Sequence, residues 1–380
     1  MTSEGRGRDI ICLSHLKWEE TLFQRPQQIM TQLARTHRVL YVGRMGAREA
    51  FAALVGLERR TFMGKRGKNL SCINVPYLPL TRRFGILGWI MWGACAACAL
   101  LAAKLLGFRK PWLWVYHPGY VPFLGLLRRD KLVYDCMDLF RGFKTSSARC
   151  AMDEAALLEK ADVVFTGGKS LQKAHAGKNP NTFCLPSGVD FDHFARATLD
   201  ETPIPEDVRD LPKPILGYFG AVDERLDFDL IRRLCDERPG RSIVLVGPLV
   251  GFLSPPVKRP NLHYLGEKEY ADLPGYLKAF DVCLMPFVIS ELTLHISPTK
   301  TPEYLAGGKP VVSTAIPDVV EDYADLVAIG EDHNDFATKV DLALKESRAG
   351  RRLRVKERPA AKSWRRIAEE MEDLILRSRT

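Results

Sequence analysis

Short apolar runs alternate along this chain with segments of helical spacing. Residues 10–13 form an apolar run that predicts a strand, residues 26–35 carry apolar side chains at helical spacing, and residues 39–42 predict a strand again. The runs are apolar almost throughout, as in parallel sheets covered by helices on both faces. We therefore expect a doubly wound α/β domain, with further strands at 112–116, 132–134, 163–166 and 183–185 and a helix at 152–160.

A second series of the same kind follows a change of composition. Residues 196–214 are rich in Asp, Glu and Pro and poor in large apolar side chains, which predicts a linker. Strands and helices then alternate again from residue 215 to residue 344, so we expect two similar domains in tandem. Because ligands of such sheets bind at the carboxyl ends of the strands, the facing edges of the two domains predict a cleft.

Residues 84–103 contain no charged side chain and have the length of a membrane span. As a helix this segment would extend about 30 Å, which is just enough to cross the hydrocarbon core. A spanning helix would divide an otherwise continuous α/β domain, and this favours a helix that is buried or docked at a surface. For a helix docked on a membrane, Trp89 and Trp92 beside the flanking arginines suit the interface.

The nine cysteines are odd in number, dispersed and mostly placed in apolar runs. This is typical of reduced thiols inside a cell, so we expect no disulfide framework. Cys95 and Cys98 lie in the apolar segment without a second pair or a histidine nearby, which favours packing over a zinc site. The first residues lack the continuous apolar core of a signal peptide, and we expect a cytoplasmic protein.

The net charge of +9 is concentrated near the C-terminal end. Residues 345–366 hold ten Lys or Arg against two Glu, which is almost the whole excess. Three interpretations stay open: contact with an anionic membrane surface, nucleic-acid binding, or a solvated helical face. The basic side chains are not interleaved with aromatic ones in a recognised motif, so we expect no nucleic-acid partner.

The segment Ser297–Ser313, SPTKTPEYLAGGKPVVS, carries the most specific pattern. Ser followed by Pro predicts a helix N-cap and first turn, which would point the backbone N–H groups of Thr299 and its neighbours toward an anion. Lys300 adds a positive charge, and Glu303, one turn further on, can accept hydrogen bonds from a vicinal diol such as a ribose. Together they suit a nucleoside diphosphate; a capped structural helix is the alternative.

A glycine-containing turn follows the first strand of the second series. Gly220 ends this strand, where glycine lets the backbone approach a phosphate closely, and Arg225 would supply a second cation. The spacing lacks the third glycine of a dinucleotide fingerprint, and Asp227 is too near to serve as the ribose acid, so a nicotinamide enzyme is disfavoured. A tight turn that requires glycine is the structural alternative.

Four motifs follow one another through the chain: DVVFTG at 162–167, LPSGVD at 185–190, the segment 217–227, and PTKTPEYLAGGKPVV at 298–312. In this order and spacing they resemble the nucleotide-sugar glycosyltransferases of the GT-B fold, most closely family 4 of the retaining enzymes. The resemblance covers nearly the whole chain. QRPQQ at 24–28 and VYDCMD at 133–138 resemble a subgroup found in bacterial exopolysaccharide and cell-wall polymer synthesis.

The resemblance implies a domain plan. It predicts two Rossmann-like doubly wound domains that face each other across a cleft. Residues 1–195 would bind the acceptor, residues 196–214 would be the linker, and residues 215–358 would bind the nucleotide sugar. A C-terminal helix within residues 359–380 would cross back to the first domain.

The resemblance also implies donor-binding residues. Lys300 and Arg225 would hold the pyrophosphate, Glu303 the ribose, and the segment 266–268 would border the base. Most relatives carry a glutamate at the position of His295 in this chain, which leaves the sugar contact open. The donor-binding candidates are Gly220, Arg225, Glu267, Lys268, His295, Thr299, Lys300 and Glu303.

Catalytic and acceptor-side candidates lie in the first domain. Many relatives carry a histidine near the end of the strand at 132–134, so Asp135 or Asp138 is the candidate replacement. His117 ends another strand, either as a catalytic candidate or as a turn residue before Pro118. On the acceptor side, Arg25 could instead pair with a surface carboxylate and Trp18 could be a core residue; the candidates here are His15, Trp18 and Arg25.

These observations predict a glycosyltransferase that uses a nucleotide-diphosphate sugar, UDP- or GDP-linked, and a saccharide or lipid-linked saccharide acceptor. Fixed cations can stabilise the departing diphosphate without a metal, so we expect neither a metal nor a cofactor. Retention of configuration follows from the resemblance, as does a role in exopolysaccharide or cell-envelope glycan synthesis. The alternatives are a nucleotide-sugar epimerase of the same fold and a nucleic-acid-binding protein. Residues 84–103 and 345–366 predict peripheral contact with the inner face of the cytoplasmic membrane.

Overall fold

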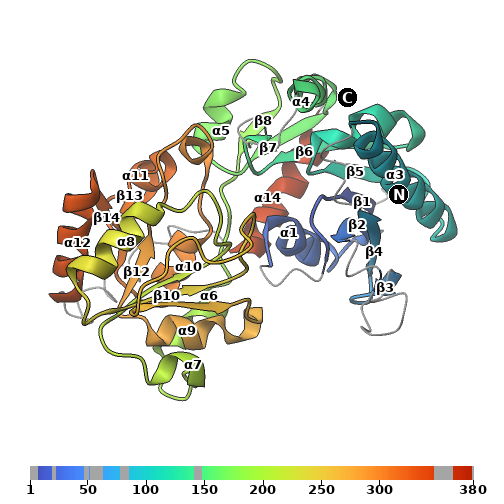
Figure 1. Ribbon diagram of the computed structural model, residues 1–380. Coiled ribbons are helices and arrows are strands. Elements are labelled where there is room, and N and C mark those ends of the chain that lie inside the picture. Colours follow the sequence, from blue (N-terminus) through green and yellow to red (C-terminus); the bar gives the residue numbers. More distant parts are fainter. Residues whose placement is uncertain are drawn as a thin grey trace. The chain divides into compact units, whose positions relative to one another are not determined.

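The chain folds into two compact units (Figure 1). Unit 1 comprises Met1–Pro186 together with Trp364–Thr380, and unit 2 comprises Ser187–Ser363. The division falls before residue 195, the boundary expected from the sequence. The computed structural model describes residues 7–18, 23–46, 51, 63–77, 85–140, 148–345 and 363–378.

Unit 1 is built on an eight-stranded sheet. Neighbouring strands pair in parallel except at one edge, where β3 is antiparallel to β4. The chain first builds the β1 to β4 side and then continues from β5 on the other side of β1, so the switch point lies between β1 and β5. In order across the sheet, the strands are β3 (Met63–Lys65), β4 (Leu70–Tyr77), β2 (Arg38–Gly46), β1 (Asp9–Leu13), β5 (Trp112–Val115), β6 (Lys131–Cys136), β7 (Val163–Thr166) and β8 (Thr182–Cys184).

Successive residues of these strands face opposite sides of the sheet, and each side has its own apolar core. In β1, Ile11 and Leu13 belong to one core, whereas Ile10 and Cys12 belong to the other. Helices cover both sides, which confirms the doubly wound arrangement. The first core is closed by α3 (Gly85–Leu105), η2 (Pro118–Leu126) and α4 (Ala148–Lys160), and the second by α1 (Arg25–Leu33) and α14 (Trp364–Arg377).

The C-terminal helix α14 belongs to unit 1. Ile367, Met371 and Ile375 recur at every fourth residue and bury one stripe of this helix. The helix packs beside α1, at the opposite end of the sequence (Figure 1). The structure therefore places the described part of the segment 359–380 with the first unit.

Unit 2 is built on a six-stranded sheet in which every neighbouring pair is parallel. The chain runs outwards from β9 through β10 to β11 and then returns to β12 on the other side of β9. The switch point of this sheet therefore lies between β9 and β12. Across the sheet, the strands are β11 (Leu262–Gly266), β10 (Ser242–Val246), β9 (Ile215–Phe219), β12 (Val282–Met285), β13 (Val311–Thr314) and β14 (Ala328–Gly330).

The linker predicted at 196–214 is wrong, because these residues fold as part of unit 2. Ala197 and Val208 are buried in its core, while the prolines and most of the charged side chains around them lie nearer the surface. Ile204 and Leu211 also pack against this core, so a few apolar anchors fix a segment whose average composition is polar. The short helices α6 (Phe191–Ala195), η4 (Arg196–Thr198) and α7 (Glu206–Arg209) pack on α9 (Leu273–Ala279), and α6 also on α10 (Lys300–Ala306).

The remaining described helices complete the two layers. In unit 1, α5 (Lys169–Ala174) leads into β8. In unit 2, α12 (His333–Lys345) packs on β12, β13 and β14. The other described helices of unit 2 are α8 (Phe228–Glu237), η5 (Tyr270–Asp272), η6 (Thr293–His295) and α11 (Pro317–Tyr323).

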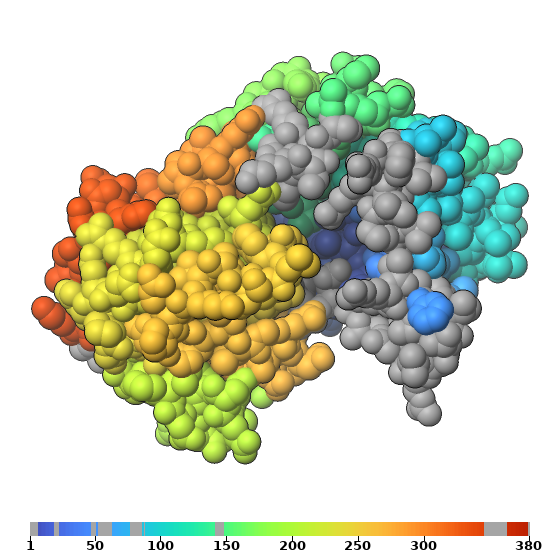
Figure 2. All heavy atoms as spheres, viewed as in Figure 1, coloured from blue at the N-terminus to red at the C-terminus, as the bar shows by residue number. Residues whose placement is uncertain are grey.

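The apolar segment expected at 84–103 is the helix α3. Its residues Cys95, Ala99 and Ala102 are buried against the sheet, which supports a docked helix. By length and composition Gly88–Leu105 could also cross a membrane, and 28% of this window is buried. The opposite side of α3 is exposed, in the cyan-to-teal region of unit 1 in Figure 2, and it presents Ile86, Trp89, Ile90, Leu101 and Leu105.

Candidate functional site

Three glycines meet at the carboxyl ends of β9, β10 and β11. Gly220, Gly247 and Gly266 have φ values of 147°, 142° and 69°, a region that side chains strongly disfavour. The Gly220 N–H donates to Val246 O at 2.8 Å, and the Gly247 N–H donates to Gly266 O at 2.8 Å. A Cβ on Gly247 would lie 1.9 Å from the carbonyl oxygen of Gly220. The backbone here is therefore closely packed, and no side chain can replace the glycine at 247 without a shift.

Lys300 lies directly against Gly220. A Cβ placed on Gly220 would lie 2.7 Å from Lys300 Cε and 2.6 Å from the Tyr218 hydroxyl. The Lys300 ammonium also donates to Thr299 Oγ1 at 3.5 Å. The structure thus brings Gly220 together with Thr299 and Lys300, which lie far from it in sequence and were predicted to share one site with it.

The helix that carries Lys300 begins differently from the prediction. Ser297 was expected to be the N-cap, but the N-cap is Thr299, and no side chain caps α10. Tyr304 instead anchors this helix to β9: its hydroxyl oxygen accepts a hydrogen bond from the Phe219 N–H at 2.9 Å. The sequence analysis missed this positioning residue. The only sign of it in the sequence was an aromatic residue one helical turn after Lys300.

The charges of Arg225 and Glu303 both affect the pKa of the buried Tyr218 hydroxyl. Burial raises the pKa of Tyr218, the positive charge of Arg225 opposes this shift, and Asp223 and Glu303 add to it. Arg225 is itself paired with Asp223 through an ion pair of 2.6 Å. The charges of Arg225, Asp223 and Glu303 therefore all reach Tyr218 of β9, and the ion pair with Asp223 offsets part of the charge that Arg225 could offer to an anionic ligand.

The Glu303 carboxyl group has a pKa that is raised toward neutrality. Its side chain is half-buried on α10. Burial raises the pKa of Glu303 to about 7, and the nearby Lys300 ammonium opposes the shift. The carboxyl can therefore change between a neutral and an ionised hydrogen-bonding partner within the physiological range.

The other donor-side candidates differ in how firmly the structure holds them. His295 is half-buried in η6, and its Nδ1 has no hydrogen-bond partner among the described residues. Lys268 forms an ion pair of 2.6 Å with Asp207, so part of its charge is used inside unit 2. Glu267 is exposed directly after β11.

In unit 1, Asp135 and Arg25 form a buried ion pair. Both are 0–1% exposed, and Arg25 Nε donates to Asp135 Oδ1 at 2.8 Å. Arg25 Nη1 also donates to the carbonyl oxygen of Leu185 at 2.8 Å. Burial raises the pKa of Asp135, whereas Arg25 and the Tyr116 hydroxyl lower it. This burial favours a structural pair over the catalytic role expected for Asp135 and the acceptor-side role expected for Arg25.

Trp18 is also a core residue rather than an acceptor-side residue. It is 8% exposed, and its ring packs edge to face on Tyr41 with centroids 5.0 Å apart. Its backbone N–H donates to Asn74 Oδ1 at 3.2 Å. Asp138 is half-buried just after β6, and its carbonyl oxygen accepts from the Cys136 thiol at 3.5 Å.

His15 and His117 follow β1 and β5, the two strands beside the switch point of unit 1, and they do come together. Their ring centroids are 5.5 Å apart, and His117 stacks on Trp92 at 4.4 Å. The guanidinium of Arg44 also lies over the Trp92 ring, 3.9 Å from its centroid. Trp92 therefore faces the histidines and not a membrane, which corrects the interface role expected for it; Trp89 remains exposed.

Both histidines of this cluster are held neutral. Burial lowers the pKa of His15 to about 3, and Arg44 lowers it further. Burial also lowers the pKa of His117, with His15 and Arg44 adding to the shift. His117 Nδ1 accepts from the Gly119 N–H at 2.9 Å and so caps η2. A neutral imidazole can accept or donate a hydrogen bond to a hydroxyl, but it carries no charge for an anion.

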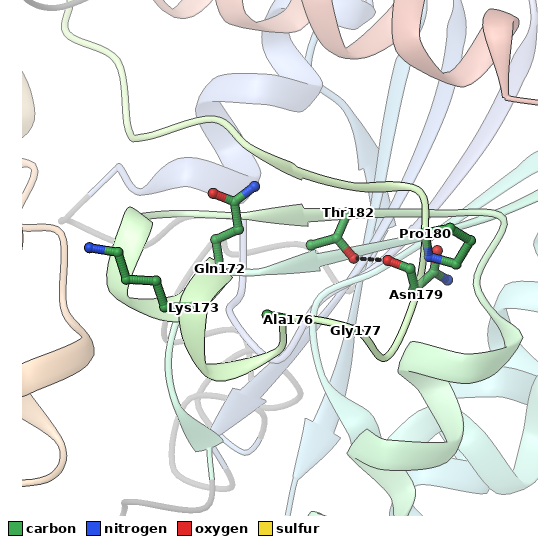
Figure 3. A pocket seen from close by; sticks show the side chains of 7 residues that line it. All are labelled: Gln172, Lys173, Ala176, Gly177, Asn179, Pro180 and Thr182. Carbon is green, nitrogen blue, oxygen red and sulfur yellow. Dashed lines mark hydrogen bonds between the residues drawn. The ribbon is translucent and has the colours of Figure 1, made fainter.

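A hollow of about 520 Å³ also lies between α5 and β8 of unit 1 (Figure 3). The turn below it is fixed by Asn179, whose Nδ2 donates to the carbonyl oxygens of Leu158 and Ala161 at 2.8 and 2.7 Å. The Thr182 hydroxyl donates to Asn179 O at 2.8 Å, as the dashed line in Figure 3 shows. None of the residues predicted from the sequence lines this hollow, and we assign it no role.

Comparison with known proteins shows similarity to glycosyltransferases in sequence and in fold. Residues 215–346 match the family model described as "Glycosyl transferases group 1". A candidate teichuronic acid biosynthesis glycosyltransferase of Bacillus subtilis is 25% identical over 225 residues, which cover 54% of this chain and 55% of the relative. The chain thus spans about half the length of the curated relative it matches.

Several solved structures share the fold over almost the entire chain. Sucrose-phosphate synthase from Thermosynechococcus elongatus superposes with a TM-score of 0.71 at 17% identity and covers 97% of this chain and 98% of its own. Starch synthase IV from Arabidopsis thaliana, bound to ADP and acarbose, gives 0.68 at 12% identity, covering 98% and 99%. A trehalose-6-phosphate structure from E. coli, bound with UDP-2-fluoro glucose, gives 0.65 at 13% identity, covering 97% and 99%. The fold is that of the GT-B enzymes, as the sequence predicted.

Proposed function

We propose that this chain, which carries a glycosyl transferases group 1 domain in residues 215–346, transfers a sugar from a nucleoside-diphosphate donor to a saccharide or lipid-linked saccharide acceptor. The proposal rests chiefly on one observation inside that domain: Lys300 packs on Gly220 at the end of β9. Glycine backbone and a fixed ammonium are suited to a phosphate group. The teichuronic acid relative supports a cell-envelope glycan as the product.

The proposed transfer depends on stabilising the negative charge of the leaving group. Breaking the bond between the sugar and its nucleotide places negative charge on the departing diphosphate. Lys300 and Arg225 stabilise this charge as fixed cations, while the Glu303 carboxylate accepts hydrogen bonds from the ribose hydroxyls. We expect retention of configuration, with the leaving phosphate accepting the proton of the acceptor hydroxyl, so that no strong protein base and no metal is needed for this step.

The acceptor is assigned to the ring cluster of unit 1. His15 and His117, which follow β1 and β5, lie together with Trp92 of α3. Aromatic faces pack well on the C–H surfaces of sugars. The neutral imidazoles offer hydrogen bonds to hydroxyl groups without adding charge. This chemistry suits the hydroxyl groups of a saccharide acceptor, while Arg44 places one positive charge beside the rings.

A nucleotide-sugar epimerase was the sequence alternative of the same fold, and nothing in the family match or the relatives above supports it. An epimerase needs no acceptor. Release of nucleoside diphosphate only after addition of an acceptor would therefore separate the two activities. The same samples would test nucleic-acid binding, the second alternative, by the salt dependence of affinity for DNA or RNA.

Peripheral contact with an anionic membrane would bring this chain to a lipid-linked acceptor at the inner face of the cytoplasmic membrane. The exposed side of α3 supports this proposal, because it presents Ile86, Trp89, Ile90, Leu101 and Leu105. Most of the basic segment 345–366 lies outside the described residues. We expect co-sedimentation with anionic vesicles that weakens with salt and with Trp89→Ser; no binding at low salt would contradict it.

The donor proposal is tested by thermal shift with UDP, GDP, ADP and their sugars. A ligand present at 100 times its dissociation constant adds about 2.7 kcal/mol to the stability of the folded state. We expect one base to raise the Tm of the wild type and to raise that of Lys300→Ala much less. If no nucleotide shifts the wild-type Tm at millimolar concentration, the donor assignment fails.

A further inference from the structure

Three side chains that can ligate a metal are buried together in unit 1, and the proposed transfer uses none of them. Cys136 ends β6, Glu154 lies on α4 and His175 follows α5. They are 0%, 3% and 1% exposed. Cys136 belongs to the VYDCMD segment at 133–138, for which the transfer mechanism provides no role.

The alternation of β6 explains how these groups meet. Asp135 faces the side of the sheet that carries α1, where it pairs with Arg25. Tyr134 and Cys136 face the opposite side and belong to the core closed by α4. Glu154 is on the buried stripe of α4, so one strand and one helix bring a thiol and a carboxyl group to the same place.

The three ligand atoms lie close to the separations that a metal ion would require. Cys136 Sγ lies 3.6 Å from His175 Nε2 and 3.9 Å from Glu154 Oε1, and these two atoms are 4.0 Å apart. Thiolate, imidazole and carboxylate ligands placed tetrahedrally around zinc are about 3.3–3.6 Å apart. The distances of 3.9 and 4.0 Å both involve Glu154 Oε1. A movement of about half an ångström by the Glu154 side chain would therefore bring all three atoms close to tetrahedral separations. The distance between Nε2 and Oε1 is longer than a hydrogen bond.

The surroundings orient the ligands. The Tyr134 hydroxyl donates to Glu154 Oε1 at 2.7 Å, as an outer partner of a metal-bound carboxylate commonly does. The carbonyl oxygen of Asp138 lies 3.5 Å from Cys136 Sγ, which also matches an edge of the same tetrahedron. Burial raises the pKa of the Cys136 thiol well above its usual range, and Glu154 adds to the shift. A positive ion would reverse this preference, because a coordinating thiol is deprotonated.

We propose that Cys136, Glu154 and His175 bind one Zn²⁺ ion. A sulfur, a nitrogen and an oxygen ligand in one set suit this borderline-soft ion better than Mg²⁺ or Ca²⁺, which prefer oxygen alone. The ion fixes α4 and the end of α5 to β6 and so has a structural role. It leaves the metal-independent transfer mechanism unchanged, since the donor candidates belong to unit 2.

The first test uses the untagged wild-type protein. After exposure to Zn²⁺ and removal of loosely bound metal, elemental analysis should find about one zinc per chain. Replacement by Co²⁺ should give the strong near-ultraviolet absorption of a thiolate-bound cobalt ion. Wild-type protein that retains only trace metal, or a cobalt spectrum without a thiolate band, would overturn the proposal.

The second test uses matched variants. Cys136→Ala and His175→Gln should lower the zinc content at least about tenfold. Cys72→Ala is the control, because Cys72 is a buried thiol of the same unit that lies in the other core. Full zinc content in Cys136→Ala, or an equal loss in Cys72→Ala, would refute the site. If the variants do not fold, the wild-type metal and cobalt measurements still decide the question.

Discussion

The two parallel sheets of this chain end in different chemistry at the same topological position. In unit 2, the strands beside the switch point lead to Gly220, which packs against Lys300. In unit 1, the strands beside the switch point lead to His15 and His117, which form a cluster with Trp92. Glycine and a cation admit an anion, whereas neutral rings admit hydroxyl groups and C–H surfaces. The fold fixes where ligands bind, and the residues at the strand ends fix which ligands they are.

Two carboxyl groups sharpen the contrast. Asp135 and Glu303 were both candidates in the sequence, each in a motif that resembles the same family. Asp135 is buried and paired with Arg25, whereas Glu303 is half-buried with a pKa of about 7. The first is part of the structure of unit 1, and the second is available to a ligand. The predictions below test this division.

The largest effect is expected for Arg25→Met. Removing one partner of a buried ion pair leaves Asp135 without compensation, which costs about 3–5 kcal/mol of unfolding free energy. Urea denaturation of the wild type and the variant measures this loss. The activity per folded molecule should stay close to that of the wild type. Unchanged stability combined with lost activity would return Arg25 to the acceptor site.

The next effect is expected for Lys300→Ala, which removes a fixed cation from the departing diphosphate. Turnover should fall about 100-fold, equivalent to nearly 3 kcal/mol of barrier, while the fold is kept. Steady-state kinetics with circular dichroism as the folding control measure it. Lys309→Ala is a matched lysine variant from the same motif, since the Lys309 ammonium donates to the carbonyl oxygens of Lys278 and Phe280. Wild-type turnover in Lys300→Ala would refute the donor site.

These two predictions also show what the sequence could and could not reveal. The period and length of apolar runs predicted most strands of both sheets, because a strand covered on both faces is apolar along its length. They did not predict β3 and β4, which form one side of the unit 1 sheet. The polar composition of residues 196–214 predicted a linker, but Ala197 and Val208 anchor this segment in the core of unit 2. The sequence could not separate Asp135 from Glu303, because burial depends on which residues from elsewhere in the chain cover each position.

The residues that gather at a strand end could be predicted where several of them belong to one sequence motif. Thr299, Lys300 and Glu303 are neighbours in sequence, so their proximity followed from one helix turn. The contact between Lys300 and Gly220 joins residues far apart, and Tyr304, which positions it, carried little sequence signal. The same limit applies to the stack of Arg44 on Trp92, whose partners come from a strand and a distant helix.

The pH dependence of donor binding is the third prediction. Burial raises the folded-state pKa of Glu303 to about 7, so the carboxyl is mostly protonated below this pH. The carboxylate is the stronger acceptor for ribose hydroxyls, so the donor KM should fall as the pH rises through 7, by up to about tenfold. Glu303→Gln should remove this slope. The same slope in both proteins would exclude Glu303 as the group responsible.

Glu303 also links stability to pH. Because its folded-state pKa is raised above the ordinary value of 4.5, the folded state binds more protons than the unfolded state between these values. Its contribution to stability is present at low pH and is lost as the pH rises through about 7. Without ligand, the wild type should therefore lose stability relative to Glu303→Gln over this range, which thermal denaturation at several pH values measures.

The smallest effect is expected for Trp92→Leu at the ring cluster. Loss of one aromatic surface should raise the acceptor KM by about fivefold and leave the donor KM unchanged. Trp89→Leu is the matched control, because Trp89 lies on the exposed side of the same helix. An increase in the donor KM alone would contradict the assignment of the acceptor to unit 1.

The central claim is tested most directly by hydrogen exchange with the nucleoside diphosphate that gives the largest thermal shift. The account predicts slower exchange in residues 219–225 and 295–304 of unit 2, and the loss of this protection in Lys300→Ala. Protection confined to unit 1, or unchanged protection in Lys300→Ala, would contradict the claim that the carboxyl end of β9 holds the diphosphate.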